Sequence, residues 1–243
     1  PHLDDACSLR PKLEVPEVLE PIKGWKVAVS MDLGYFNVDN EVQKVVREAT
    51  TAFQELGCTV ENVDVGWDFS VLDAQTTFQE TLLAALGGDL YPRWKYEMDA
   101  MVRVGIERGL QLSAKRYYDI NFVRGKMYET LGPILEDYNI LVCPVTALPG
   151  LPAVHDLLDT SLRINGEPLT YGNLPGDKWL HWQLSYPFNM IPECPIAAVP
   201  AGFVDGLPIG MQIVGRTYDD ISVFRAAADY ERARPWRDKC PPI

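Results

Sequence analysis

Apolar and polar positions alternate near the N-terminus in a pattern that predicts a strand, a helix and a second strand. The helix is expected to begin at Asn40, which resembles a capping box with Gln43, and to end at Gly57. Residues 59–65 read as the second strand. This order predicts a right-handed βαβ unit in a parallel sheet, and therefore an α/β fold. The apolar positions of the first strand are Trp25, Val27, Val29 and Met31, and those of the helix are Val42, Val45, Val46, Ala49, Phe53 and Leu56.

Two longer segments flank this unit. Residues 1–23 are rich in proline and polar side chains, and we expect them to form an extended lead-in. Residues 68–137 lack a long β-branched run, and we expect them to be mostly helical. Their aromatic side chains either pack within a helical layer or line a substrate pocket. These aromatic residues are Phe69, Phe78, Tyr91, Trp94, Tyr96, Tyr117, Tyr118, Phe122 and Tyr128.

The C-terminal part alternates between short apolar runs and turn residues. A buried strand is expected over 140–143, stopped by Pro144, and a loop over 147–177 with a small hairpin turning at Asn165-Gly166. Residues 178–189 look helical, and strands follow at 196–199 and 209–214, joined by a turn at Asp205-Gly206. The last helix should start near Asp219 or Asp220 and end at Pro235. Its buried positions are expected to be Ile221, Phe224, Ala227 and Ala228.

Composition narrows the class of protein. The chain has 22 basic and 34 acidic residues, and its net charge of −12 disfavours nucleic acid and anionic membrane partners. No apolar run approaches the roughly 20 residues that a membrane-spanning helix needs. The N-terminus has no initiating Met and no signal-peptide pattern, so it reads as the middle of a longer chain.

The cysteines and histidines show no pattern of a metal site. Five scattered cysteines argue against a disulfide framework and favour a reducing, cytoplasmic location. They are Cys7, Cys58, Cys143, Cys194 and Cys240. None forms a CxxC pair, and His2, His155 and His181 have no metal-ligand spacing, so no metal is expected.

The usual nucleophile motifs are absent from the sequence. There is no GxSxG elbow, no serine followed three residues later by lysine, no HExxH motif and no nucleotide-binding glycine loop. Cys143 and His155 form a conceivable thiol–imidazole pair, but Cys143 lies in an apolar run where a thiol usually acts as a small hydrophobe. The residues alone therefore indicate an α/β domain without a catalytic group of its own.

Several motifs nevertheless occur together in one order. GLPIGMQIVG at 206–215 follows YPFNM at 186–190 and PIAAVPAGF at 195–203, and it precedes YERARPW at 230–236. Upstream stand KGWKVAV at 23–29, LGCTV at 56–60 and DYNILVCPVT at 137–146. In this order they resemble the C-terminal half of the amidase-signature family. The match is good over 24–65 and 134–237 and poor in the helical middle.

The resemblance implies both a fold and a chemistry. It implies that residues 1–243 form the C-terminal half of a single domain, an α/β/α sandwich around a mixed sheet, with 68–137 as a helical layer on the substrate side. It also implies a Ser–cis-Ser–Lys triad and an oxyanion-binding loop that would both precede Pro1. This chain would then hold no catalytic residue, need no cofactor, and require an N-terminal catalytic half as partner, because the family's sheet runs through both halves.

The positions expected to bind substrate lie after strand ends and in the 178–191 region, where α/β sheets place their ligands. Each also has a purely structural interpretation as turn or core, and His181 is taken as structural. Gln212, polar in an apolar strand, is expected to satisfy backbone groups. The substrate-binding candidates are Thr146, Trp179, Trp182, Phe188, Asn189 and Ile191.

Three functions remain open from the sequence. The leading hypothesis is hydrolysis of a small-molecule carboxylic amide, with this chain inactive alone and with a homodimer as an open option for the complete enzyme. The alternatives are a non-catalytic α/β binding or regulatory module and a tRNA-linked amidotransferase subunit of the same fold. The ending ARPW at 233–236 and the acidic charge favour the stand-alone amidase.

Overall fold

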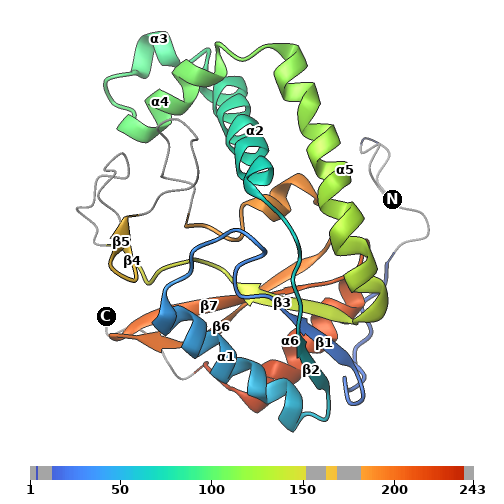
Figure 1. Ribbon diagram of the computed structural model, residues 1–243. Coiled ribbons are helices and arrows are strands. Elements are labelled where there is room, and N and C mark those ends of the chain that lie inside the picture. Colours follow the sequence, from blue (N-terminus) through green and yellow to red (C-terminus); the bar gives the residue numbers. More distant parts are fainter. Residues whose placement is uncertain (1–3, 5–12, 152–162, 169–181, 238–243) are drawn as a thin grey trace.

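A five-stranded mixed sheet forms the centre of the molecule in the computed structural model, which describes residues 4, 13–151, 163–168 and 182–237 (Figure 1). The strand order is β2-β1-β3-β7-β6. Strands β2, β1 and β3 are mutually parallel, whereas β7 runs antiparallel to both β3 and β6. The strands are β1 (Lys26–Val29), β2 (Thr59–Asn62), β3 (Ile140–Pro144), β6 (Ile196–Val204) and β7 (Leu207–Val214). The mixed α/β sheet is therefore confirmed.

Helices cover the sheet in two layers. On one face α1 and α6 contact each other and β6 and β7, and the ring of Phe53 stacks on Tyr230 at 5.6 Å. On the other face α5 contacts β3, and α2 packs against α4 and α5 (Figure 1). The helices are α1 (Asn40–Glu55), α2 (Phe69–Gly87), α3 (Tyr91–Trp94), α4 (Ala100–Gly109), α5 (Ala114–Asp137) and α6 (Asp220–Ala233), with a 3-10 helix η1 at Pro187–Met190.

The β1–α1–β2 unit forms as its pattern predicts, with a different N-terminal cap. The carboxylate of Asp39, not the side chain of Asn40, accepts from the backbone N–H of Glu41 at 2.9 Å. Gln43 instead donates to the carbonyl of Val38 at 2.9 Å. The expected capping box is therefore wrong by one residue, because a carboxylate just before the helix reaches the free amides of the first turn.

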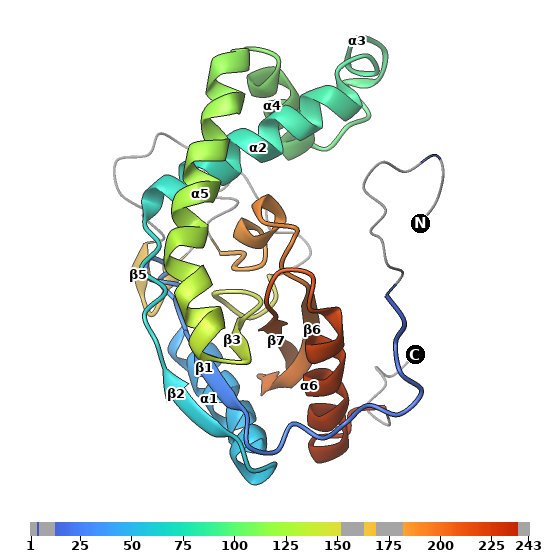
Figure 2. The same cartoon turned by 90° about the vertical axis from the view of Figure 1, so that its right-hand side faces the viewer.

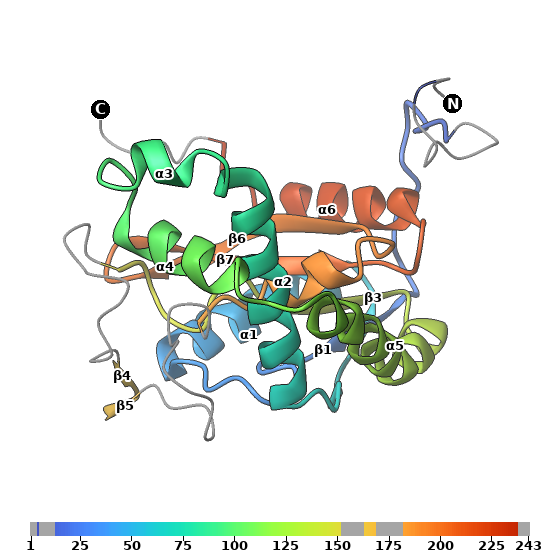
Figure 3. The same ribbon diagram turned by 90° about the horizontal axis from the view of Figure 1, so that it is seen from above.

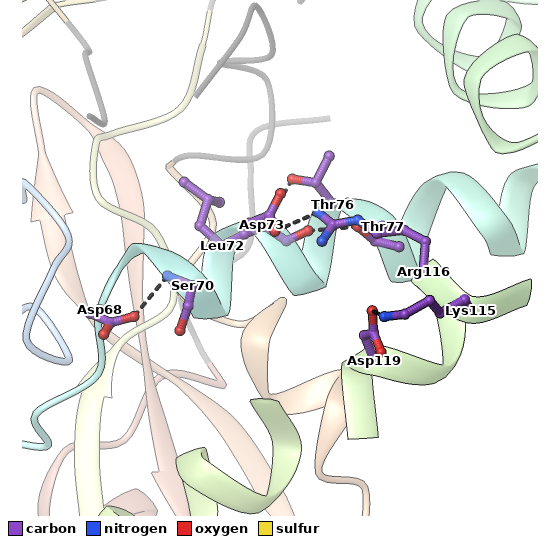
Figure 4. Close-up of polar contacts among 9 residues, drawn as sticks. All are labelled: Asp68, Ser70, Leu72, Asp73, Thr76, Thr77, Lys115, Arg116 and Asp119. Atoms are coloured by element: carbon purple, nitrogen blue, oxygen red, sulfur yellow. Dashed lines mark hydrogen bonds and ion pairs between the residues drawn. The ribbon is translucent and has the colours of Figure 1, made fainter. Parts of the chain in front are cut away.

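Residues 68–137 are mostly helical, as expected, and an ion pair links the two long helices of this segment. Arg116 of α5 forms an ion pair with Asp73 of α2, and Asp68 caps α2 by accepting from the N–H of Ser70 at 2.7 Å (Figure 4). At the far end of α5, the Arg216 guanidinium donates to the carbonyls of Leu135 and Glu136. These bonds satisfy carbonyl groups that a helix end leaves without partners.

The hairpin expected at Asn165-Gly166 is present as β4 (Arg163–Ile164) and β5 (Glu167–Pro168). Both turn residues have positive φ, 55° and 81°, as the tight turn requires. Asn165 also accepts from the N–H of Asn40 at 2.9 Å and donates to the carbonyl of Val38 at 3.2 Å. The hairpin is thereby attached to the start of α1.

The lead-in is neither helix nor strand over 13–25, as expected, and it runs beside α6 (Figure 2). Arg225 of α6 donates to the carbonyls of Glu20 and Pro21 at 2.9 and 2.8 Å, and its guanidinium stacks over the ring of Trp25. The N–H of Ile22 donates to the buried carboxylate of Asp229 at 2.8 Å. The lead-in is therefore fixed along α6 by hydrogen bonds between its backbone and side chains of that helix.

Those same contacts explain why the expected buried face of α6 is wrong. Phe224 is 47% exposed, and Ile221, Ala227 and Ala228 are only partly buried. The residues of α6 that are buried are Val223, Ala226, Asp229 and Tyr230. Asp229 is turned inward to accept from Ile22, and the hydroxyl of Tyr230 donates to the carbonyl of Pro200 at 2.9 Å. Two polar anchors thus set the rotation of the helix against its apolar pattern.

The helix expected over 178–189 is also wrong in its described part. Residues 182–186 form turns, and a single 3-10 turn follows from Pro187 to Met190. A bridge between Thr146 and Gln183 holds this segment against the end of β3, which is incompatible with a continuous helix. Residues 178–181 lie outside the described part of the chain.

Replacing two glycines of the helical segment by alanine is expected to have opposite effects on stability. A Cβ at Gly109 of α4 would lie 2.0 Å from the carbonyl oxygen of Glu80 in α2, so Gly109→Ala should lower the free energy of unfolding by about 1–3 kcal/mol. A Cβ at Gly125 of α5 would point into open space beyond its own helix backbone, so Gly125→Ala should raise the free energy of unfolding by about 0.5–1 kcal/mol. Chemical denaturation of both variants checks the prediction. Equal effects at both positions would contradict the α2–α4 packing.

Candidate substrate-binding site

One half of the sheet is covered on a single face only. The helices that pack substantially on β6 are α1 and α6, which lie on the same side. On the opposite face of the sheet α5 packs over β3 rather than over β6 (Figure 2 and Figure 3). Ile196, Ala198 and Pro200 of β6 are consequently exposed. The site described below lies on this open half of the sheet.

A pocket of about 440 Å³ lies between this part of the sheet and η1. That volume is within the range usual for small-molecule sites. Apolar and small polar side chains share its lining. The lining residues are Ser185, Phe188, Asn189, Pro192, Cys194, Pro195, Ile196, Ala198 and Gln212.

Gln212 forms the polar part of the pocket's floor. Its side chain donates to the carbonyl of Pro144 at 2.9 Å and contacts the sulfur of Cys143 at 3.4 Å. Only 2% of the residue is exposed. The amide therefore satisfies a backbone group, as expected, and the residue also lines the cavity.

Phe188 and Asn189 of η1 form one wall. The Phe188 ring is buried and lies 5.2 Å from the ring of Trp67, whose indole donates to the carbonyl of Met127 at 3.1 Å. Asn189 is exposed and also borders a second pocket of about 180 Å³ between η1, α2 and α5. Phe188 is therefore both a core residue and a pocket wall.

The other described candidates, Ile191, Thr146 and Trp182, have different surroundings. Ile191 is buried and lines a third pocket of about 280 Å³ beside α5. Thr146 donates to the carbonyl of Leu148 at 2.9 Å, and Trp182 is partly buried against the core. Neither lines any of these three pockets. Trp179 and His181 lie outside the described residues. The binding roles of all six candidates stay predictions.

An ion pair that the sequence pattern did not reveal stands between the second and third pockets. Arg124 of α5 approaches Glu193, in the loop after η1, with 3.1 Å between nitrogen and oxygen. Both side chains line the third pocket, and Arg124 also lines the second. The two residues are 69 positions apart, so neither signals the other in the sequence.

The cysteines near the site are not activated. Burial raises the pKa of Cys143 to about 12, and burial together with the charge of Glu193 raises the pKa of Cys194 to about 11. Because the thiolate is the nucleophilic form, both thiols are inert near neutral pH.

The described residues contain neither a cluster of possible metal ligands nor a helix that could span a membrane. Within those residues, no three His, Cys, Asp or Glu side chains gather closely enough to hold a metal. No described helix combines the length and the apolarity needed to cross a bilayer.

Comparisons with known proteins agree on one family. A family model described as Amidase matches residues 4–224. The chain is 30% identical over 239 residues to an acylamidase of Rhodococcus erythropolis, covering 90% of this chain and 44% of that protein. It is 26% identical over 246 residues to a glutamyl-tRNA(Gln) amidotransferase subunit of Lactiplantibacillus plantarum, covering 91% of this chain and 47% of that protein.

Among solved structures, a bacterial aryl acylamidase of the amidase signature family superposes with a TM-score of 0.78 at 25% identity. The superposition covers 93% of this chain and 48% of that structure. The chain thus spans about half the length of the relatives it matches.

Proposed function

This chain belongs to the amidase family, and from that membership we propose that it supplies the substrate-pocket half of an enzyme that hydrolyses a small-molecule carboxylic amide. In this proposal the nucleophilic serine, the bridging cis-serine and the lysine base lie in an N-terminal half that precedes these residues in the family. The pocket walled by Phe188 and Asn189 receives the acyl group of the amide.

The open half of the sheet supports a docked N-terminal half. Strand β6 is nine residues long and is an edge strand of the described sheet, with an exposed apolar row on one face. The outer edge of such a strand has unpaired backbone N–H and C=O groups, which favour pairing with another segment. The pocket lies on that same open face, so a half docked there would bring its catalytic groups next to Phe188 and Asn189.

One observation carries the choice of hydrolase. This chain is 30% identical to the acylamidase of Rhodococcus erythropolis, and the match covers 90% of this chain. The amidotransferase subunit, at 26% identity, supports the rival role. Hydrolysis of a small amide without any tRNA would favour the hydrolase, and amide formation on a glutamyl-tRNA would favour the rival.

The chemistry of the complete enzyme is tested with two reagents. A serine-directed sulfonyl fluoride should abolish amide hydrolysis, and peptide mass spectrometry should find the label outside residues 1–243. A chelator should leave the activity unchanged, because the proposed serine mechanism uses no metal. Labelling of a residue within 1–243 would overturn the assignment of the nucleophile. Loss of activity on chelation that added zinc restores would overturn the serine mechanism.

A further inference from the structure

An exposed aromatic pair marks the outer face of α5. Tyr118 is 65% exposed and Phe122 is 66% exposed, and their rings meet edge to face with 6.5 Å between centroids. Aromatic side chains this exposed and adjacent on one helix are typical of contact surfaces.

This face points away from the rest of the described molecule. Tyr118 and Phe122 are each two residues from the buried Ile120, and at about 100° per residue both lie nearly opposite it. The residues of α5 that line the pockets, Tyr117 and Asn121 among them, lie between these two faces.

Charges on this face are arranged symmetrically about Phe122. Lys115 and Glu129 each lie seven residues from it, on opposite sides, and both are exposed. Tyr118 and Lys126 each lie four residues from it, again on opposite sides. If two α5 helices pack antiparallel with their Phe122 rings at the centre, each Lys115 faces a Glu129 and each Tyr118 ring faces a Lys126 ammonium.

We propose that the outer face of α5 binds a second copy of this chain about a two-fold axis through Phe122. The arrangement is complementary only to itself, as an isologous interface must be. Helix α5 has 24 residues and is about 36 Å long, so the contact can run over several turns. A single helix face contributes the contact, and we expect a dissociation constant roughly in the micromolar range. This inference does not depend on the proposed reaction.

Sedimentation velocity of the full native polypeptide over a concentration series tests the proposal. The wild-type protein should dimerise, and Phe122→Asp should weaken the dimer on the order of 100-fold, because a central aromatic contact is replaced by two facing charges. Phe224→Asp is the matched control, since Phe224 of α6 is also exposed, at 47%, and lies outside the proposed contact. A monomeric wild type, or a dimer that Phe224→Asp disrupts and Phe122→Asp does not, would overturn the proposal.

A charge exchange tests the pairing itself. Lys115→Glu and Glu129→Lys alone should each weaken the dimer roughly tenfold, because each places like charges opposite one another twice per dimer. The double variant should restore most of the affinity, although Lys115 also pairs with Asp119 of its own helix at 2.6 Å (Figure 4). Failure of the double variant to recover would show that these side chains do not face each other. Circular dichroism confirms that every variant is folded.

Discussion

Residues 1–243 alone are expected to release no detectable ammonia or amine from any amide, whereas the same residues combined with their N-terminal half are expected to be active. The sequence contains no motif for an activated serine, and the described thiols nearest the pocket have raised pKa values. Without a nucleophile and an oxyanion-binding loop the full rate enhancement is lost, which for enzymes is at least about 10⁶-fold.

The measurement is product release from a panel of aliphatic and aromatic amides, by the chain alone and by the co-expressed halves. Cys143→Ala in the chain alone is the control, because Cys143 with His155 is the one conceivable thiol–imidazole pair in the sequence. Turnover by residues 1–243 that survives this substitution would show that the chain carries its own catalytic group. Inactivity of both preparations on the whole panel would count against the hydrolase and favour the binding module.

Phe188→Ala in the complete enzyme is expected to change which amides it prefers. The ring lines the pocket, and its removal takes away contact with a bulky acyl group but not with acetamide. Burial of an apolar side chain contributes roughly 1.5–3 kcal/mol, so kcat/KM for a bulky aliphatic or aromatic amide should fall about 10–100-fold relative to acetamide.

Phe53→Ala provides the matched control for that experiment. Phe53 is as deeply buried but lies on the other face of the sheet, stacked on Tyr230. Both substitutions should lower the melting temperature, since a buried Phe→Ala change costs about 3–5 kcal/mol. Only Phe188→Ala should change the ratio of bulky to short substrate. If both variants lose stability and neither changes that ratio, Phe188 is a core residue and the pocket assignment is wrong.

Local signals were sufficient for most of the elements. The alternation over 25–31 predicted β1, and Asn165-Gly166 predicted the β4–β5 turn, because a two-residue turn with positive φ selects those residue types. The family resemblance added the mixed sheet, which the solved structure of an aryl acylamidase confirms. It could not place the individual walls of a pocket, since these come from η1, β6 and β7 together.

The errors in α6 and in the 178–189 segment share one physical origin. The pattern of α6 favoured Phe224 as buried, but hydrogen bonds from Ile22 to Asp229 and from Tyr230 to Pro200 rotate the helix. These partners are 207 and 30 residues apart in the sequence, so no local window contains them. The 178–189 segment failed similarly, because the bridge from Thr146 to Gln183 decides its backbone.

The sequence by itself therefore determined most strands and helices, because backbone propensity and side-chain periodicity act over a few residues, and its motifs pointed to the family. The tertiary structure alone decided how helices rotate, which half of the sheet stays open, and that Phe188, Asn189 and Gln212 meet at one pocket. Buried polar groups must find partners wherever the chain brings them, and that requirement outweighs local amphipathic pattern when the two conflict.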